Sequence, residues 1–368
     1  MKDQQPTLIL ISPGFAKDEN DTTCLPAQQA LVLALNKNYP DLSIIILALE
    51  YPFSKTTYQW KGNTVISFNA WKKSSVKKLF IARSVWKTLD KIKREQNVIG
   101  VLSFWCTHCA FLGKRFAKKN NIKHYSWILG QDAKKGNKYI KWIKPKQHEL
   151  IALSDFVARE FYKNYHVMPS NIIPYGIDPA EYLESNYTRD IDVAATGSLI
   201  PLKQYDLFIS LIFQLKKKFP NIRAVLCGKG PEEKKLKHLI AEYELENHIL
   251  LAGEVPHDEV LKIMQRTKIF LHPSSYEGFG GVCIEALAAG AHVISFCKPM
   301  DEEIIYWHIV KNENEMLQAT IDILQDNSTE HFSVIPYTVD GCVETIMQLF
   351  SYDKKNISTP AELYAHNY

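Results

Sequence analysis

Two glutamates, Glu277 and Glu285, stand eight positions apart in a stretch that reads HPSSYEGFGGVCIEALAAGAHVIS. The first falls in a turn with three glycines, and the second falls inside the helix-like segment VCIEALAAG. A glycine-rich turn that opens a helix presents backbone N–H groups to an anion. A carboxylate beside such a turn repels phosphate, so it needs another ligand, and sugar hydroxyl groups are the ligands that we expect. The stretch therefore predicts a site for a molecule that carries both phosphate and sugar.

The elements predicted around these glutamates alternate between strand and helix. The apolar runs KIFLH and AHVIS flank the turn and the helix as two strands, and Gly290 closes the helix. The same order opens the chain, where the strand LILISPG leads through Gly14 to the helix-like CLPAQQALVLALNKNYP. The strand DVAATGSL, with Gly197 and Ser198, starts a further unit of this kind. Repeated strand, turn and helix units are typical of α/β folds with Rossmann-like, doubly wound domains.

The stretch around Glu277 resembles a motif of the retaining glycosyltransferases of family 4. That family carries an E-x7-E pattern within P-S-x-x-E-G-F-G and E-A-L-A-x-G-x-P-V-I, and His292 stands here in place of the usual proline. The resemblance implies the GT-B fold, in which two Rossmann-like doubly wound domains face each other across a cleft. It also implies that Glu277 contacts hydroxyl groups of the donor sugar and that Glu285 contacts the nucleotide ribose. The backbone of Phe279–Gly281 would approach the sugar and the pyrophosphate.

A second family segment sets the expected domain boundary. The family's N-G-[IV]-D turn, which marks the crossing between domains, reads Y-G-I-D here, with Tyr175 in place of the asparagine. The resemblance implies an N-terminal acceptor-binding domain at residues 1–177 and a C-terminal nucleotide-sugar-binding domain at residues 178–345. The linker is expected around 175–188. A C-terminal helix or tail at 346–368 would return toward the N-terminal domain.

The donor site implied by the resemblance includes one retained cation. The family pattern G-R-x-x-x-x-K-G holds the donor pyrophosphate; Lys203 falls on its lysine, whereas Ser198 replaces its arginine. Lys229 is a candidate to replace that arginine. A lysine beside a leaving diphosphate offsets the charge that develops there, so Glu277 and Lys203 are the predicted catalytic residues. The donor site would comprise Gly14, Gly197, Ser198, Lys203, Val255, Glu277, Gly278, Phe279, Gly280, Gly281 and Glu285.

The acceptor side departs from the family. The family carries a histidine close to the reacting sugar in an H-G-x-D pattern, which reads L-G-Q-D here with Leu129 in the histidine's place. Gln131, Asp132 and His108 are the candidates to serve instead. For His108, a structural role on a helix is the alternative.

Neither a metal nor a cofactor is expected. Cys106 and Cys109 form a C-T-H-C pair, but no second pair completes a tetrahedral zinc site. The triplet Asp190-Ile191-Asp192 resembles a metal-binding D-x-D, but it precedes its strand, whereas the metal-binding version follows one. The nucleotide-sugar itself counts as a substrate.

Basic residues gather in the first half of the chain. Residues 1–175 hold 27 lysines and arginines against 12 aspartates and glutamates, although the whole chain has a net charge of only +4. Such asymmetry predicts a polyanionic or membrane-surface partner for this half. No nucleic-acid motif accompanies the charge, so nucleic acid is not an expected partner.

The segment Val76–Val98 is predicted to be an amphipathic helix. We expect its apolar stripe to pack on the core, through Val76, Leu79, Phe80, Val85, Trp86, Leu89 and Ile92. The opposite face is basic and could hold the protein at an anionic leaflet without insertion, through Lys77, Lys78, Arg83, Lys87, Lys91, Lys93 and Arg94. No apolar run has the eighteen or more residues of a membrane helix, and the scattered cysteines fit a reducing compartment. The expected location is cytoplasmic, peripheral at the inner face of the membrane.

The predicted function is retaining, metal-independent glycosyl transfer by a hexosyltransferase. A nucleotide-sugar, with a UDP-sugar favoured over a GDP-sugar, would donate to a glycan or polyprenyl-diphosphate-linked acceptor in cell-surface polysaccharide or lipopolysaccharide synthesis. One alternative is a sugar-nucleotide epimerase of the same fold, which would need acid and base residues at C2 of the sugar. Another is a non-catalytic nucleotide-sugar-binding protein, with Ser198 and Leu129 as signs of decay. The intact Glu277, Glu285 and Lys203 favour an enzyme.

Overall fold

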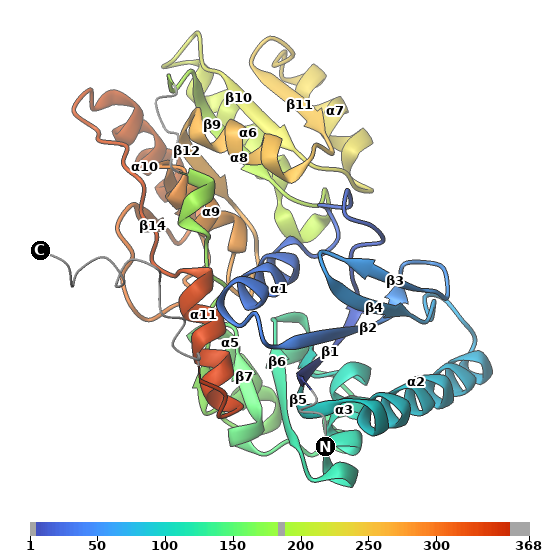
Figure 1. Cartoon of the computed structure of the whole chain (residues 1–368). Helices are drawn as coiled ribbons and strands as arrows, with labels where there is room; N and C mark the ends of the chain where they lie inside the picture. The colour runs from blue at the N-terminus through green and yellow to red at the C-terminus, as the bar shows by residue number, and fades with distance from the viewer. Residues whose placement is uncertain (1–4, 183–187, 354–368) are drawn as a thin grey trace, which may run out of the picture.

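Two α/β units, each built on its own sheet, make up the computed structural model, which describes residues 5–182 and 188–353 (Figure 1). All strand pairs named in the two sheets are parallel except the β3–β4 hairpin. Helices cover parallel sheets on both faces, so their central strands are apolar on both sides. β1 (Pro6–Gly14) and β2 (Ser43–Tyr51) are accordingly buried along almost their whole length.

The first sheet has the strand order β3-β4-β2-β1-β5-β6-β7-β8. Its remaining strands are β3 (Thr57–Trp60), β4 (Asn63–Ser67), β5 (Asn97–Phe104), β6 (Lys123–Ile128), β7 (Leu150–Ala152) and β8 (Asn171–Ile172). The helices of this unit are α1 (Pro26–Asn38), α2 (Ser75–Glu95), α3 (His108–Asn120), α4 (Tyr139–Ile143) and α5 (Asp155–Tyr165). The order reverses between β1 and β5, so the loops that follow these two strands diverge and leave a crevice between them.

The second sheet has the strand order β11-β10-β9-β12-β13-β14. Its strands are β9 (Ile191–Thr196), β10 (Ala224–Cys227), β11 (Ile249–Gly253), β12 (Thr267–His272), β13 (His292–Ser295) and β14 (Trp307–Ile309). The helices after β9 are α6 (Tyr205–Lys216), α7 (Glu233–Glu242), α8 (His257–Gln265), α9 (Gly281–Ala288), α10 (Glu313–Gln325) and α11 (Val339–Leu349). Here the order reverses between β9 and β12. The strand, glycine turn, helix and strand predicted around Glu277 are β12, the turn, α9 and β13.

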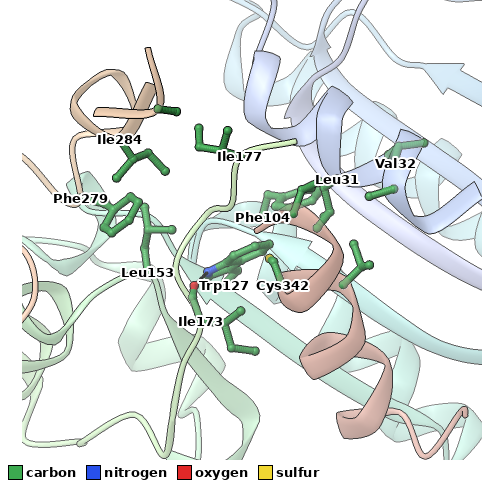
Figure 2. Close-up of a cluster of buried hydrophobic side chains, with 14 of the residues drawn as sticks. Leu31, Val32, Phe104, Trp127, Leu153, Ile173, Ile177, Phe279, Ile284 and Cys342 are labelled. Carbon is green, nitrogen blue, oxygen red and sulfur yellow. Dashed lines mark hydrogen bonds between the residues drawn. The ribbon is translucent and has the colours of Figure 1, made fainter. Parts of the chain in front are cut away.

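One cluster of buried apolar side chains joins the two units. Figure 2 shows Phe279 and Ile284, from the second unit, on one side of the chain segment that carries Ile177, with Leu31 of α1 on its other side. Trp127 lies between them, and its Nε1 donates a hydrogen bond to the Ile173 carbonyl at 3.2 Å. Apolar burial therefore holds the two sheets together as well as each sheet to its own helices.

The last helix, α11, packs on the first unit rather than on the second. The chain returns at Thr338, which pairs with Ile177 in an isolated parallel bridge. Asp340 then contacts Lys37 of α1 at 3.0 Å, and a side chain at Gly100 of β5 would collide with Phe350. The return to the first unit therefore begins before the predicted boundary at 345. The tail at 354–368 and part of the linker, 183–187, lie outside the described residues.

The prediction that the apolar side chains at the start of α2 pack on the core is wrong. Val85, Leu89 and Ile92 are buried as expected, but Val76, Leu79 and Phe80 are exposed, because the first turns of α2 extend beyond the strands that the rest of the helix covers. Trp86 is half-buried. Within the described ranges, none of the helices has the length and apolar character needed to cross a bilayer.

Candidate functional site

A cleft between the two sheets brings most of the predicted donor residues together. It has a volume of about 470 Å³ and is lined from both units. The first unit contributes the loop before α1 and the residues after β5 and β6, and the second contributes the loops after β9, β10 and β11 and the start of α9. Of the predicted donor residues, those that line the cleft are Gly197, Ser198, Val255, Glu277, Phe279, Gly280, Gly281 and Glu285.

The N-terminus of α9 faces this cleft. Gly280 precedes the helix with φ of 79°, a left-handed conformation that glycine adopts without strain. No side chain of the described residues caps the helix there, and Gly281 and Val282 line the cleft. The first backbone N–H groups of a helix lack partners within the helix and attract anions. This end of α9 is therefore suited to a phosphate group.

Glu277 is held in an ion pair at the edge of the cleft. Its Oε2 accepts a hydrogen bond from Lys203 Nζ at 2.6 Å and lies 3.4 Å from Nε2 of His272. Burial raises the pKa of the Glu277 carboxyl, but Lys203, together with His272 and the Gly278 amide, lowers it by more, so the pKa lies below its ordinary value. Burial, aided by the Lys203 ammonium, lowers the pKa of His272 to about 4. At neutral pH the Glu277 side chain is thus a carboxylate, and the His272 imidazole beside it is neutral.

Lys203, unlike Glu277, does not itself line the cleft; it lies beside the loop that follows β9. Its Nζ lies 4.0 Å from the point where a Cβ on Gly197 would stand. That Cβ would also lie 2.8 Å from the Tyr205 hydroxyl, and Gly197 has φ of 144°, so a larger residue does not fit. The bare backbone at Gly197 leaves the Lys203 ammonium close to the cleft, where it can reach a ligand phosphate.

The other predicted acid, Glu285, has a partner that sequence reasoning missed. Its Oε1 lies 3.0 Å from Nε2 of His257, and both side chains line the cleft. The hydrogen bond to Glu285 raises the pKa of His257 more than burial lowers it, and Glu181 of the linker raises it further. His257 contacts only one of the two carboxylate oxygens of Glu285. Its place at the start of α8, two residues after the predicted donor residue Val255, was the signal available in the sequence.

The remaining donor candidates divide between the cleft and its surroundings. Val255 lines the cleft beside Glu254, and Lys229, the proposed substitute for the missing arginine, lines it beside Ser198. Gly14 does not line the cleft: it is buried at the end of β1, where a Cβ would meet Tyr51 at 3.3 Å. The loop that follows β1 reaches the cleft farther on.

Gly278 makes a contact between the two units instead of lining the cleft. A Cβ there would lie 2.6 Å from the Leu129 carbonyl oxygen. Its own carbonyl accepts a hydrogen bond from the Ser154 hydroxyl at 2.5 Å. The neighbouring Tyr276 donates to the Gly130 carbonyl at 2.9 Å. The glycine is therefore needed for close approach of two backbones, which is a different requirement from ligand binding.

The three acceptor-side candidates do not line the cleft. Gln131 is exposed. Asp132 is buried and accepts hydrogen bonds from the backbone amides of Cys106, Leu129 and Gly130, at 2.6, 3.0 and 3.0 Å. Burial raises its pKa to about 6, although these amides act in the opposite direction. The geometry of Asp132 is that of a residue that fixes the loop after β6.

His108 is the first residue of α3, which follows β5. It therefore lies at the carboxyl end of the first sheet's strands, as the loop after β6 does. Its Nε2 is 3.6 Å from Glu50 Oε1, and within the described structure it has no hydrogen-bond partner. Burial, with a smaller effect from Lys78, lowers the pKa of His108 to about 4. His108 packs beside Tyr139, with ring centroids 6.0 Å apart. This environment fits the structural alternative for His108.

Other residues form the wall of the cleft on the first unit. Thr22 and Thr23 line it from the loop before α1, and Trp105 and Leu129 line it from the ends of β5 and β6. Tyr175 also lines it, and its hydroxyl accepts a hydrogen bond from Gln28 Nε2 at 2.6 Å. The sequence signal for Trp105 and Leu129 was their position directly after apolar strands, where α/β proteins bind ligands.

No group of three or more histidine, cysteine or acidic side chains is arranged to hold a metal ion in the described parts of the chain. The D-x-D triplet is engaged elsewhere: Asp190 pairs with Arg266 at 2.5 Å and Asp192 with Lys268 at 2.8 Å. Both acids thus have cationic partners on the surface of the second unit.

Comparison with known proteins identifies the second unit. Residues 184–333 match the family described as glycosyl transferases group 1. A subunit of the phosphatidylinositol N-acetylglucosaminyltransferase of Schizosaccharomyces pombe is 29% identical over 241 residues, which are 62% of this chain and 52% of that protein. The 2-deoxystreptamine N-acetyl-D-glucosaminyltransferase of Niallia circulans is 31% identical over 99 residues, 27% of this chain and 25% of the relative. The chain thus spans about half the length of the first relative and a quarter of the second.

Solved structures share the whole two-unit arrangement. The sucrose-phosphate synthase of Thermosynechococcus elongatus superposes with a TM-score of 0.68 at 16% identity, covering 94% of this chain and 95% of that one. The Anabaena protein HepE, in complex with UDP and glucose, superposes with a TM-score of 0.66 at 16% identity, covering 93% and 95%. At this level of identity the likeness concerns the fold. Residues 184–333 therefore form a group 1 glycosyl transferase domain, and the chain as a whole has the GT-B fold.

Proposed function

We propose that this protein transfers a sugar from a nucleotide-sugar to an acceptor in the cleft between its two units. The observation that carries the proposal is the Lys203–Glu277 ion pair beside the uncapped N-terminus of α9. A cation and free amides suit a diphosphate, whereas a carboxylate suits sugar hydroxyls. Glu277 and the first residues of α9 line one cleft, and the Lys203 ammonium lies 2.6 Å from the Glu277 carboxylate at its edge, which suits a sugar diphosphate.

The chemistry asks these residues to stabilise a leaving group. As the bond between sugar and diphosphate breaks, negative charge grows on the phosphate oxygens, and the α9 amides and Lys203 offset it. Glu277 orients the sugar by accepting hydrogen bonds from its hydroxyl groups. Lys203 must then leave Glu277 for the phosphate. The contact between them in the free protein is exchanged for contacts with the two ends of the donor.

The donor that we propose is a UDP-sugar, with UDP-N-acetylglucosamine first to be tested. Support comes from the names of the relatives, which are N-acetylglucosaminyltransferases, and from the HepE complex with UDP and glucose. The two relatives are named for different acceptors, phosphatidylinositol and 2-deoxystreptamine. The acceptor that we propose is a glycan or a polyprenyl-diphosphate-linked glycan of cell-surface polysaccharide or lipopolysaccharide synthesis, because the first half of the chain is strongly basic.

We further propose that the transfer is retaining and independent of metal. The E-x7-E resemblance supports retention, and the cations of the cleft support charge neutralisation by protein groups. Both parts are open to direct measurement. NMR of the product formed on a soluble acceptor gives the anomeric configuration, and an inverted anomer rules out retention. Turnover after treatment with EDTA tests the second part, and complete loss of turnover that divalent metal restores rules it out.

The first prediction concerns Glu277. Wild-type protein incubated with UDP-, GDP-, ADP- and CMP-sugars should release nucleotide slowly from one of them, because water substitutes for the acceptor. Glu277→Gln should release at least about 100-fold less, since it loses the charge that grips the sugar hydroxyls. Glu242→Gln, an exposed acid on α7, is the matched control and should behave as wild type.

The products of this experiment separate the alternatives. An epimerase would yield a sugar inverted at C2, whereas a transferase acting on water yields the unchanged sugar. A binding protein would be stabilised by UDP in a thermal-shift assay and would release no nucleotide from any donor. Either outcome with folded wild-type protein would end the proposal of glycosyl transfer.

A further inference from the structure

Exposed apolar side chains surround the N-terminal end of α2. Val76, Leu79 and Phe80 are 66%, 63% and 63% exposed, and their i, i+3, i+4 spacing places them on one face of the helix. Trp71, 48% exposed, lies four residues before the first residue of α2, and its ring centroid lies 6.5 Å from that of Phe53, which is 62% exposed. We call these five residues the α2 tip. Figure 1 shows this end of α2 at the outer edge of the first unit, reached by the chain that descends from β4.

In the sequence around the α2 tip the charged side chains are basic, and the nearest preceding acid, Glu50, interacts with Lys78. Between Glu50 and Asp90 the sequence contains no acidic residue, while lysine or arginine occupies positions 55, 61, 72, 73, 77, 78, 83 and 87. Lys72 Nζ lies 5.9 Å from the centroid of the Trp71 ring, so cation and apolar group stand together. Apolar side chains surrounded by lysines match the boundary between anionic headgroups and acyl chains, where tryptophan is also favoured.

We propose that the α2 tip docks on an anionic lipid bilayer, with its apolar side chains inserted below the headgroups and its lysines on the anionic surface. A two-fold contact between copies of this chain would place the same acid-free basic segments opposite each other, which charge repulsion opposes. Attraction to an anionic leaflet contributes with every lysine near the surface. This surface goes beyond the purely electrostatic, non-inserted contact predicted from the sequence.

The α2 tip is connected to the mouth of the cleft. Phe53 packs against Tyr51, with ring centroids 5.1 Å apart, and the Tyr51 hydroxyl donates to Asp21 at 2.8 Å. Thr22 and Thr23, which follow Asp21, line the cleft. Docking through the tip would therefore bring the bilayer beside the first unit's wall of the cleft, where a lipid-linked acceptor would enter. This last step rests on the proposed glycosyl transfer, whereas docking itself does not.

Vesicle binding tests the docking. Purified protein is sedimented with vesicles of phosphatidylcholine alone and with about 30% phosphatidylglycerol, at about 0.1 M and 0.5 M salt. Wild type should bind only the anionic vesicles and bind more weakly at high salt. Leu79→Ser/Phe80→Ser should lower the partition coefficient at least about tenfold, because two inserted side chains are lost. Both side chains are exposed, so the substitutions leave the core intact.

Three controls make the outcome decisive. Leu250→Ser/Ile305→Ser removes two equally exposed apolar side chains from the second unit and should bind as wild type. Acyl-chain-brominated lipid should quench wild-type fluorescence more than that of Trp71→Phe, which reports insertion of Trp71. Sedimentation velocity without lipid reports self-association.

Three results would overturn the docking proposal: no binding to anionic vesicles, equal binding by both double variants, or a lipid-free dimer that Leu79→Ser/Phe80→Ser disrupts. Nucleotide release in solution is measured on the same samples and should be unaffected by the tip substitutions. A protein that docks but releases no nucleotide would contradict the proposed function alone.

Discussion

At the scale of single residues, Lys203 and Glu277 form an ion pair to which the proposed function adds a role in donor binding. Their side chains are only 16% and 24% exposed, and their charged atoms lie 2.6 Å apart. An ion pair in a partly buried site stabilises the fold mainly because each partner would be costly alone. In the proposed function, donor binding replaces this contact by two others, so substitution of either residue should affect stability and turnover differently.

A double-mutant cycle separates the two effects. Lys203→Met should lower the free energy of unfolding by about 1–3 kcal/mol, because it leaves the Glu277 carboxylate partly buried without its cation. Lys203→Met/Glu277→Gln should recover most of that loss, since the unpaired charge is gone, yet it should stay as inactive as either single variant. Urea unfolding and nucleotide release on the same samples provide the comparison. A double variant less stable than Lys203→Met would show that the pair is not a charge-compensating unit.

Residue roles were predictable from sequence where a spaced pattern constrained them and unpredictable where a partner lay far along the chain. The glycines and acids of the stretch around Glu277 belong to one turn and one helix, so their proximity followed from local structure. His257 meets Glu285 only because α8 and α9 lie side by side. Asp132 was one of three acceptor-side candidates; its oxygens accept hydrogen bonds from backbone amides, which no pattern of residue types reveals.

At the scale of elements, the alternation of strands and helices was predictable because buried parallel strands are apolar throughout. The burial of the start of α2 was not predictable. Periodicity identifies the apolar face of a helix, but it does not give the length of helix that neighbouring elements cover. Val85 and Val76 have the same residue type in the same helix, yet one is buried and the other exposed. The glycine turn before α9 also has a structural role that its motif does not indicate: Gly278 lies in the contact between the two units.

The turn before α9 supports a prediction about packing. Gly278→Ala should lower the free energy of unfolding by about 1–3 kcal/mol, because the added methyl group would collide with the Leu129 carbonyl, 2.6 Å away, and push the two units apart. Gly281→Ala, three residues later at the first position of α9, is the matched control: its Cβ would meet nothing within 4 Å, so stability should be unchanged or slightly higher. Urea unfolding measures both. Equal effects of the two substitutions would mean that the close contact at Gly278 carries no energy.

At the scale of the whole molecule, the two units share one apolar cluster, and α11 leaves the second unit to pack on the first. Such a joint core predicts that unfolding of one unit exposes apolar surface of the other, so the two should lose stability together. Each unit also buries a neutral histidine. Burial lowers the pKa of His124 in the first unit to about 3, and burial with the Lys203 ammonium lowers that of His272 in the second to about 4.

These histidines predict acid sensitivity with a definite sign. Above pH 6.5, the ordinary pKa of histidine, they are neutral in the folded and unfolded chain, and their contribution to stability is complete. As the pH falls below 6.5, these histidines become protonated in the unfolded chain but remain neutral in the folded chain. Each histidine should then lower the free energy of unfolding by up to about 1.4 kcal/mol per pH unit, until the pH reaches its folded-state pKa.

Urea unfolding between pH 7.5 and 5 measures this slope. This pH range lies above the ordinary pKa of most carboxyl groups, about 4. His124→Gln should flatten it by about 1 kcal/mol per pH unit below pH 6, because glutamine retains a polar group near Ser103, which lies 3.0 Å from His124 Nε2, and binds no proton. His238→Gln, which replaces an exposed histidine of α7, should leave the slope as in wild type. If His124→Gln and wild type lose stability in parallel, the buried imidazole is protonated in the folded protein, and its neutrality cannot be the source of acid lability.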